Sequence, residues 1–398
     1  MKSSQLSLQS LLFLLAGLTA LAPLAIDAYL PAIPSMAISF GTSVHHVELS
    51  LSLFLAGFAI GQLIGGPFSD HFGRRLTVFV GLFIFACGTL GIIFSSTLNG
   101  LLLFRIVEAF GGGMAIVNSG AIIRDVSSGR DSARNLSQMA LIMMMAPLLA
   151  PIIGMGLLHI TGWHGIFVFL FIYTVIISFF IYKNIPETRA KNEHRPNAIQ
   201  RYLAVIKHRH ALGYLFALCF AYGGMFAFIT GSPSVYMGFF NISETVYPLF
   251  FGANIVTMVL ANRINVRLLR RCNPSSLLSF GQSIQLVTGI ILLSYVSIID
   301  APLLAVVVGL VMLFVGSQSF IVSNATSSTI EFFPTNSGTA SALLGASGFA
   351  TGALSGSLVG LLGDGTPLPM ALVMTGCIIM GISLRYLMQR PNKAKTDP

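Results

Sequence analysis

The chain has 398 residues, of which 55% are hydrophobic and only 9% are charged, whereas about a quarter of the residues in an ordinary soluble domain carry a charge. This composition excludes a soluble globular protein, because so much apolar surface needs lipid as its solvent. The net charge of +9 therefore does not indicate nucleic-acid binding, and the question becomes which side of a membrane the basic residues face.

Twelve segments of the sequence are long and apolar enough to cross a bilayer, which takes about 20 residues of helix. The first begins near Leu8, is too long for the apolar region of a signal peptide and has no clear cleavage site, so we expect it to be retained. Segments of this length exclude a β-barrel. The predicted spans are 8–30, 46–67, 76–95, 101–123, 136–159, 165–183, 211–237, 246–262, 275–297, 302–324, 337–361 and 367–388.

The basic residues are distributed very unevenly over the loops. If the N-terminus lies in the cytoplasm, every one of the 22 Lys and Arg residues except Arg105 falls on the cytoplasmic side. This asymmetry predicts a multi-pass protein with both termini in the cytoplasm. The long basic segment 184–210 divides the chain into two six-helix bundles, 1–183 and 211–398, and two such halves are the layout of many secondary transporters.

Charged residues inside the spans need a partner or a function, because a charge in lipid is costly. Asp27 lies near the outer end of the first span. Arg105 and Glu108 lie at a similar depth in the fourth span, roughly 6 and 10 Å below its outer end. Asp27 and Arg105 can therefore meet, and Arg105 and Glu108 share a helix face. Glu48 lies at the edge of the second span, where we expect it to be solvated.

Asp27, Arg105 and Glu108 are our candidates for proton coupling. An arginine keeps a neighbouring carboxylate charged, whereas desolvation opposes the charge. A carboxyl group balanced between these effects can gain and lose a proton as a cavity opens to one side and then to the other. We therefore predict coupling through Asp27, Arg105 and Glu108. The alternative is a static ion pair that fixes the first span against the fourth.

A specific motif follows the second span, from Gly66 to Arg75. It has the pattern Gly-x-x-x-Asp-x-x-Gly-Arg-Arg/Lys, in which Gly73 permits a tight turn and Asp70 can meet a basic residue or a helix N-terminus. The run resembles the signature between helices 2 and 3 of major facilitator transporters. The resemblance implies a cytoplasmic latch between the halves, and the alternative is a simple basic topology anchor. The gate residues it implies are Gly66, Asp70, Gly73, Arg74, Arg75 and Asp125.

Two further motifs of the family are present in modified form. The run 105–111 resembles the Arg-x-x-Gln-Gly region of the fourth helix, but Glu108 replaces the usual Gln, which leaves its role open. In the fifth span, Pro147, Pro151 and Gly154 resemble the motif associated with antiporters of the superfamily. Two prolines four residues apart remove backbone hydrogen bonds and bend the helix, and a kink without transport meaning is the alternative.

The sequence also resembles one branch of this superfamily, the Bcr/CflA drug-efflux transporters. The resemblance rests on the runs 23–34, 57–64 and 162–164 and covers nearly the whole chain. It implies an all-α major facilitator fold of twelve helices and a drug:proton antiporter of the bacterial inner membrane. Members of the branch export bicyclomycin, phenicol-type antibiotics and other small molecules.

Small residues are concentrated in two spans. The second span has glycines at four-residue spacing, and the eleventh has five glycines within sixteen positions. Such faces let helices approach closely, and in the family fold these two helices meet between the halves. The glycines are Gly57, Gly61 and Gly65 in the second span and Gly345, Gly348, Gly352, Gly356 and Gly360 in the eleventh.

A pocket for a small molecule is mostly apolar with a few polar groups, and the seventh span is rich in aromatic residues. By analogy with the family, the first, fourth, seventh and tenth spans line the cavity, although aromatic residues in a membrane helix often face lipid instead. The candidate cavity residues are Tyr29, Asn118, Tyr222, Phe226 and Gln318.

The function predicted from these features is export of small amphipathic drugs or metabolites by a monomer that uses the proton gradient and needs no cofactor or metal. A nutrient:proton symporter of the same fold is the alternative. A membrane enzyme does not fit, because the histidines are scattered rather than clustered with acids. The sequence has no P-loop for ATP.

Overall fold

The computed structural model describes residues 8–127, 129–185, 187–188, 198–333 and 337–390, and these residues are helical apart from short connections. The helices of the first half are α1 (Leu8–Asp27), η1 (Leu30–Ala32), α2 (Ile33–Ser39), α3 (Val44–Phe72), α4 (Arg74–Ile93), α5 (Leu98–Val126), α6 (Gly129–Thr161) and α7 (Trp163–Asn184). They are followed by α8 (Ala198–Lys207), α9 (Arg209–Ser232), η2 (Pro233–Phe239), α10 (Tyr247–Leu268), α11 (Pro274–Ile298), α12 (Leu304–Glu331), α13 (Ser337–Leu362) and α14 (Leu368–Gln389).

The described helices agree with the twelve predicted spans. Eleven are long and apolar enough to cross a membrane, and a shorter apolar stretch, Met145–Thr161, belongs to α6, which covers the fifth predicted span. Two details differ from the prediction. The first span ends at Asp27 and continues as a 3-10 turn and the short α2, and the polar linker contains the helix α8.

Local sequence fixes the ends of several helices. Ser43 caps α3 by accepting a hydrogen bond from the backbone N–H of His46, and Thr97 caps α5 in the same way through Gly100. Gly73 has a φ of 104°, a conformation that suits glycine, and it turns the chain sharply between α3 and α4. Short connections of this kind place consecutive helices antiparallel and side by side.

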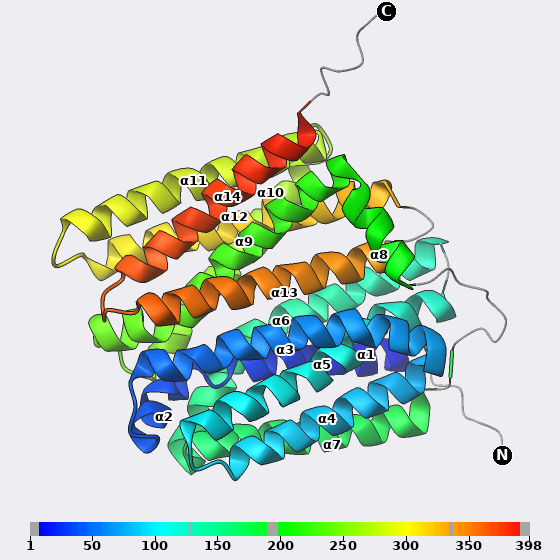
Figure 1. The fold of residues 1–398 in the computed structure, drawn as a ribbon, viewed down its shortest axis with the longest axis horizontal. Helices are drawn as coiled ribbons and strands as arrows, with labels where there is room; N and C mark the ends of the chain where they lie inside the picture. Colours follow the sequence, from blue (N-terminus) through cyan, green and yellow to red (C-terminus); the bar gives the residue numbers. More distant parts are fainter. Residues whose placement is uncertain (1–7, 128, 186, 189–197, 334–336, 391–398) are drawn as a thin grey trace, which may run out of the picture.

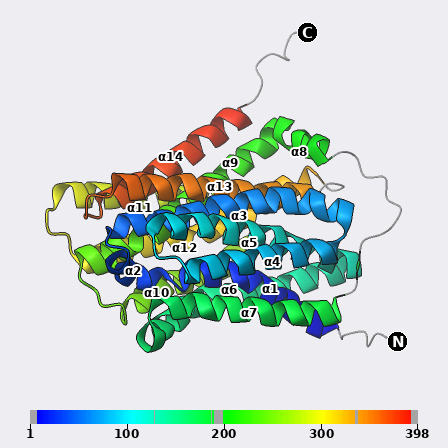
Figure 2. The same ribbon diagram turned by 60° about the horizontal axis from the view of Figure 1, so that its bottom comes forward.

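The helices form two groups with their axes roughly parallel (Figures 1 and 2). Helices α1 to α7 make up one half and α9 to α14 the other, with α3 lying beside α13 where the halves meet. A second contact between the halves joins α6 to α10. The start of α1 and the end of α14 lie at the end of the bundle that carries α8 (Figures 1 and 2).

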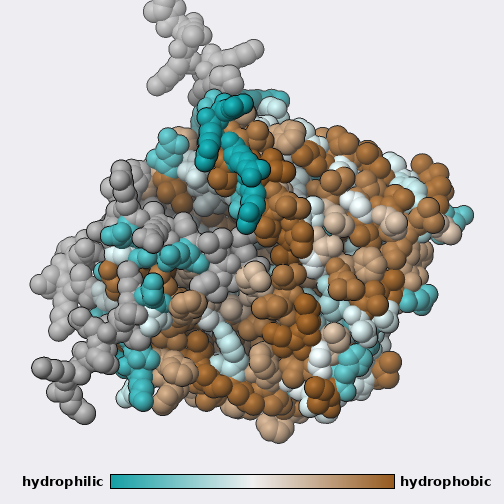
Figure 3. All heavy atoms as spheres, turned by 180° about the vertical axis from the view of Figure 1, so that it is seen from behind, coloured by the Kyte–Doolittle hydropathy of each residue, from teal (hydrophilic) through white to brown (hydrophobic). Residues whose placement is uncertain are grey.

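The outer surface of the bundle is apolar, which is the reverse of a soluble protein. Phe83, Leu249 and Leu361 are examples of large side chains that are about 70% exposed, at 70%, 70% and 73%. Hydrophobic residues cover much of the face seen in Figure 3, and hydrophilic ones gather towards its margins. A surface of this kind is suited to the hydrocarbon core of a bilayer.

The glycine-rich faces of α3 and α13 pack against different neighbours. Gly57, Gly61 and Gly65 face the backbone of α5, within the first half, where a Cβ atom would collide with main-chain atoms. The second and eleventh predicted spans, α3 and α13, do meet between the halves as expected, but these three glycines pack within the first half. Their stripe brings two helices of one half into close contact, which is what fixes the position of the α5 side chains.

The glycines of α13 divide between two neighbours. Gly345 faces Gln62 of α3, and Gly360 faces Leu49 of the same helix, so this part of the stripe does lie between the halves. Gly348 and Gly352 instead face Tyr222 and Phe226 of α9.

Candidate coupling site and gates

Arg105 lies at the centre of the candidate coupling site and is completely buried. Its Nη1 donates to Oε2 of Glu108 at 2.7 Å, and its Nη2 donates to the carbonyl oxygen of Ala25 at 3.1 Å. Its guanidinium carbon lies 4.4 Å from the ring centroid of Tyr29 and 4.3 Å from that of Phe54. Two aromatic faces and two acceptors thus satisfy a charge that lipid alone cannot accommodate.

Glu108 is held from both sides. Its second oxygen, Oε1, accepts a hydrogen bond from the hydroxyl of Thr89 on α4 at 2.9 Å. Gly88 lies against the backbone of Glu108, where any side chain would collide, so that α4 can come close enough for this contact. Arg105 and Glu108 therefore form an ion pair fixed in place by three helices of the first half.

Asp27 is the last residue of α1 and is only 4% exposed. The structure does not bring it into an ion pair with Arg105, which bonds to Glu108 and to Ala25 instead. The physical reason is the end of the helix: carbonyl groups of a last turn lack intrahelical donors, and the guanidinium fills that need at Ala25. Oδ1 of Asp27 is buried without a hydrogen-bond partner.

The surroundings of Asp27 belong to both halves. Asp27 interacts electrostatically with Tyr247 at the start of α10, whose hydroxyl is 2.7 Å from that of Ser232. On the other side, Gly154 of α6 packs directly on the carbonyl of Ala28. Asp27 thus lies where the first half faces the second, and the glycine of the fifth-span motif packs against its neighbour.

Pro147 and Pro151 lie inside α6, which continues through both of them to Thr161. Leu148, between them, is the side chain that Gly252 of α10 faces across the two halves. The motif therefore lies on the helix that contacts both the end of α1 and the second half.

The gate motif forms a compact cluster at the α8 end of the bundle. Arg74 donates to Asp70 at 2.9 Å and to Asp125 at 3.3 Å, and also to the hydroxyl of Ser69. Arg75 lies apart from these acids and donates to the carbonyl oxygen of Tyr182 at 2.7 Å. Arg74 therefore joins α3, α4 and α5.

Two partners in this cluster were not predicted. Arg201 of α8 forms an ion pair with Asp70 at 2.8 Å, and Glu187 accepts hydrogen bonds from the backbone N–H groups of Arg74 and Arg75. Gly66 lies beside the hydroxyl of Tyr202, also on α8. A signal existed in the sequence, because Glu187 is one of only two acidic residues in the basic linker 184–210, but nothing fixed where the linker would fold.

The family model of the Major Facilitator Superfamily matches residues 15–357. The chain belongs to the Major Facilitator Superfamily. It is therefore a multi-pass membrane transporter of small molecules rather than an enzyme.

Relatives within this superfamily agree with the branch that the sequence resembles. A bicyclomycin resistance protein homolog of Haemophilus influenzae is 34% identical over 94% of this chain and 95% of its own. A chloramphenicol resistance protein of Pseudomonas aeruginosa is 29% identical over 73% of this chain and 70% of its own. Multidrug resistance protein D of Escherichia coli is 27% identical over 61% of each chain.

Solved structures show the same fold at low sequence identity. A bacterial homolog of the human lysosomal transporter Spinster, inward-facing and occupied, has a TM-score of 0.73 at 12% identity and covers 97% of this chain and 99% of its own. A D-xylose–proton symporter has a TM-score of 0.70 at 16% identity and covers 96% and 98%. These two structures establish the fold of this transporter but not its substrate or mechanism.

The predicted cavity residues occupy different environments in this facilitator. Tyr29 is completely buried, with its ring on Arg105 and its hydroxyl 3.2 Å from that of Ser50, so it lies with the residues predicted to couple protons and not with the other cavity candidates. Asn118 donates to the carbonyl of Met114 in its own helix, which leaves its buried amide oxygen without a partner.

Tyr222 and Phe226 lie together. Their rings stack at 6.1 Å, and that of Phe226 lies 5.5 Å from Phe349 of α13. Phe349 contacts Phe58 of α3 at 4.6 Å. Gln318 lies close to this group through Met225, whose sulfur is 3.4 Å from the amide nitrogen. The aromatic row crosses from α9 through α13 to α3, and thus from one half to the other.

Glu48 does not occupy the solvated position expected from the sequence. It is completely buried, and its Oε1 accepts hydrogen bonds from both the backbone N–H and the hydroxyl of Ser234. The expectation failed because the second half, folded far along the chain, covers this end of α3. Among the described residues no cluster of three or more His, Cys, Asp or Glu side chains is arranged to hold a metal ion.

Proposed function

We propose that this transporter exports small amphipathic drugs or metabolites across the bacterial inner membrane in exchange for protons. The observation that carries the proposal is the environment of Asp27. Its carboxyl group is buried where the two halves meet, and its Oδ1 has no hydrogen-bond partner. The names of the relatives support export, since they include bicyclomycin, chloramphenicol and multidrug resistance proteins.

In this proposal, Asp27 carries the proton and Arg105 positions it. Arg105 is bonded to Glu108 and Ala25, so its fixed positive charge can act on Asp27 electrostatically and not through a direct ion pair. A carboxyl group without an ion pair can be neutral in one state and charged in another, at a cost set by how much water reaches it. Cargo and proton then compete for, or alternate at, the same region.

The moving units are the bundles 1–183 and 211–398, connected by the linker 184–210. Rocking of one half against the other opens the site to each side in turn, as in other secondary transporters with repeated halves. We assign the cluster of Asp70, Arg74 and Arg201 to the cytoplasmic gate, which places both termini in the cytoplasm. Each monomer works alone, without a cofactor.

Transport assays in everted membrane vesicles test this function. We expect labelled bicyclomycin or chloramphenicol to accumulate in energised vesicles that contain the protein, and an uncoupler to abolish the accumulation. Addition of the drug should also release protons from the vesicle lumen. Accumulation that is indifferent to the uncoupler would contradict proton exchange.

The runner-up is a nutrient:proton symporter, a function supported only by the fold shared with the D-xylose–proton symporter. It predicts that an inwardly directed proton gradient drives uptake of a solute in right-side-out vesicles. Exchange and symport thus give opposite directions of cargo movement for one gradient.

A further inference from the structure

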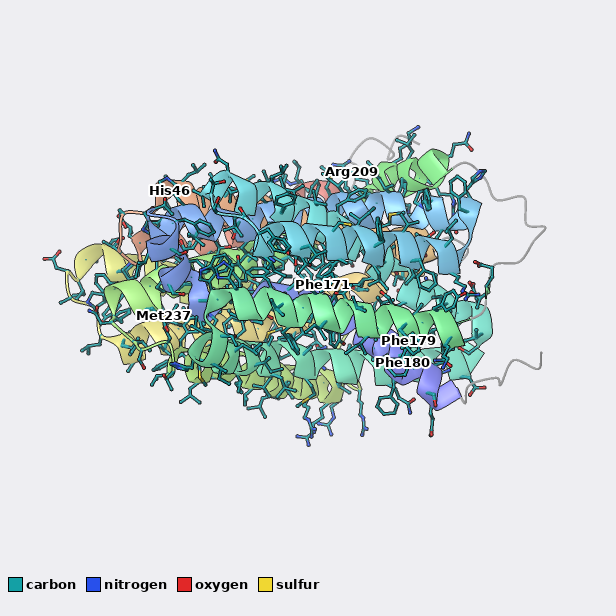
Figure 4. All side chains as sticks on the ribbon, turned by 90° about the horizontal axis from the view of Figure 1, so that it is seen from below. His46, Phe171, Phe179, Phe180, Arg209 and Met237 are labelled. Carbon is teal, nitrogen blue, oxygen red and sulfur yellow. The ribbon has the colours of Figure 1, made fainter. Side chains whose placement is uncertain are left out.

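Glu48 connects the two halves at the end of the bundle opposite α8, which we call the outer end. Its Oε1 accepts hydrogen bonds from the N–H of Ser234 at 3.1 Å and from the hydroxyl of Ser234 at 2.7 Å. Its Oε2 is 3.2 Å from Nδ1 of His45 on the same helix. His46 lies two residues before Glu48, and Met237 lies three residues after Ser234. Both are at this same end of the bundle (Figure 4).

The partner of Glu48 is an irregular segment. After Ser232, α9 gives way to the π-helical η2, which begins at Pro233. A π-helical turn changes which carbonyl each N–H meets, and such turns are frequent at functional sites. Glu48 therefore binds the second half where its backbone is already irregular and does not have to break a regular helix.

Burial of the Glu48 carboxyl group at this contact costs free energy. A carboxyl group with no exposed surface forgoes its hydration, and three contacts with neighbouring donors are needed to replace it. Two of the three come from the opposite half, so opening the outer end removes them and returns the group to water.

Other groups near Glu48 titrate over different ranges or lie towards solvent. Tyr29 and Tyr247 interact electrostatically with it, but tyrosine titrates near pH 10 in its usual state. His45 is the one that can change charge near neutrality, and it also feels Asp364 after α13. The short helix α2 and the segment η2 bring only Tyr236. His45 is thus the titratable group that touches Glu48, and Tyr29 and Tyr247 act on it electrostatically. Asp364 acts on His45, Arg105 acts on Tyr29, and Asp27 acts on Tyr247.

We propose that Glu48 is a second proton-binding site, which locks the outer ends of the two halves together as a carboxylate and releases them when it is protonated. Hydrogen bonds to a charged acceptor are roughly twice as strong as those to a neutral one, so a proton on Glu48 weakens both bonds from Ser234 together. The lock rests on the proposed alternation of the halves, but it is separate from the coupling role of Asp27.

The lock predicts which arrangement of the two halves acid favours. Because Glu48 is completely buried in the closed arrangement, it binds a proton from outside only when the outer end opens. Acid on the outer side therefore holds the transporter open there, and neutral conditions favour closure. Asp27 and Glu48 lie on different elements and can be changed one at a time.

Distances between spin labels at the outer end test the lock. Labels at Ile38→Cys and Leu303→Cys report on opposite halves, at positions that are 84% and 67% exposed. Cys87→Ser and Cys272→Ser remove the exposed native thiols, and Asp27→Asn removes the other proton site from the parent protein. In this parent, we expect a long-distance population that grows several-fold as the pH is lowered from 8 to 4, the range in which a carboxyl group exposed to water takes up its proton.

Three variants separate the groups that touch one another. Glu48→Gln should show the long distance equally at both pH values. Ser234→Ala should increase the long-distance population at pH 8 but keep its pH response, because the carboxylate and the backbone N–H remain. His45→Gln should keep the response as well.

A Glu48→Gln protein with the same pH response as its parent, or a parent with no response, would overturn the lock. Loss of the response in His45→Gln would also overturn it, because histidine would then be the sensor. Failure of proton-linked drug accumulation is read in a different assay, so it counts against the proposed function and not against the lock.

Discussion

Arg105 is bound to the carbonyl oxygen of Ala25, one helical turn from the position that Tyr29 occupies over the same guanidinium. The link fixes the end of α1 to the first third of α5 without using the side chain of Asp27. Nη1 and Nη2 of the buried arginine are thus bonded to Glu108 and to a backbone group, its Nε has no partner, and Asp27 stays outside the ion pair. The first two predictions follow from this division of roles.

Replacement of Asp27 by Asn should abolish proton-linked export while the protein still inserts and folds. Asn keeps the size of the side chain but cannot carry the coupled proton, and the lost carboxylate oxygen had no hydrogen-bond partner. Drug-dependent proton release from everted vesicles measures the effect, and we expect at least a tenfold loss. Asp364→Asn, at an exposed carboxylate, is the matched control and should transport normally.

Removal of Arg105 should cost stability for a reason that can be cancelled. In Arg105→Ala, Glu108 remains buried without its ion-pair partner, and such a loss destabilises a protein by about 3–5 kcal/mol. Adding Glu108→Gln should recover most of the thermal stability in detergent but not the transport. Transport that returned together with the stability would show that Arg105 is only a structural partner of Glu108.

The hydrophobic pattern and the loop charges were enough to predict the membrane fold, because lipid forces each span into a helix of nearly fixed length. The contact of Asp70 with Arg74 also followed from the sequence, since four-residue spacing and a positive-φ glycine act locally, whereas Asp125 was expected from the resemblance to the family. The partners Arg201, Ser234 and Ala25 could not be predicted. Each depends on the packing of distant segments, and Ala25 contributes only a backbone carbonyl, which has no signature in the residue type.

The same limit applies at α3, where the environment of Glu48 was predicted wrongly and the partner of the glycine stripe could not be predicted. A glycine stripe indicates that some helix comes close, but it does not say which one, and the stripe of Gly57 faces α5 rather than α13. Glu48 lies only five residues into α3, where a charge is usually solvated. Only the position of η2 in space shows that this end is covered.

Loss of the ion pair between Asp70 and Arg201 should speed opening of the cytoplasmic end. Arg201→Ala removes one of the groups that join the linker helix to α3, while Arg74 still bonds to Asp70. Because both side chains are partly exposed, we expect a modest change, about twofold to fivefold in transport rate. Lys207→Ala, at an exposed position of the same helix, should leave the rate unaltered.

Combining the variants distinguishes a direct contact from two separate effects. If Arg201 acts through Asp70, then Arg201→Ala should add little in an Asp70→Asn background, as expected for residues that share one interaction. Fully additive effects on the transport rate would contradict a gate built on this pair.

Two glycines of α6 differ sharply in what surrounds them, and the difference predicts opposite effects of one methyl group. A Cβ at Gly154 would fall inside van der Waals contact with the carbonyl oxygen of Ala28, whereas a Cβ at Gly156 would have no neighbour within 4 Å. Gly154→Ala should therefore push α6 away from the end of α1. The expected cost is about 1–3 kcal/mol of stability, as for other overpacked sites, with a loss of transport because Asp27 is next to the displaced backbone.

Gly156→Ala makes the same chemical change two residues along and should be neutral or slightly stabilising, since alanine is the better helix former. Melting temperatures in detergent and drug accumulation in vesicles compare the two variants directly. Equal effects would mean that the helical propensity of α6, and not its contact with α1, governs the behaviour of this motif. Unequal effects of the predicted sign would assign the fifth-span motif a specific task, which is to hold the end of α1, and with it Asp27, against the second half.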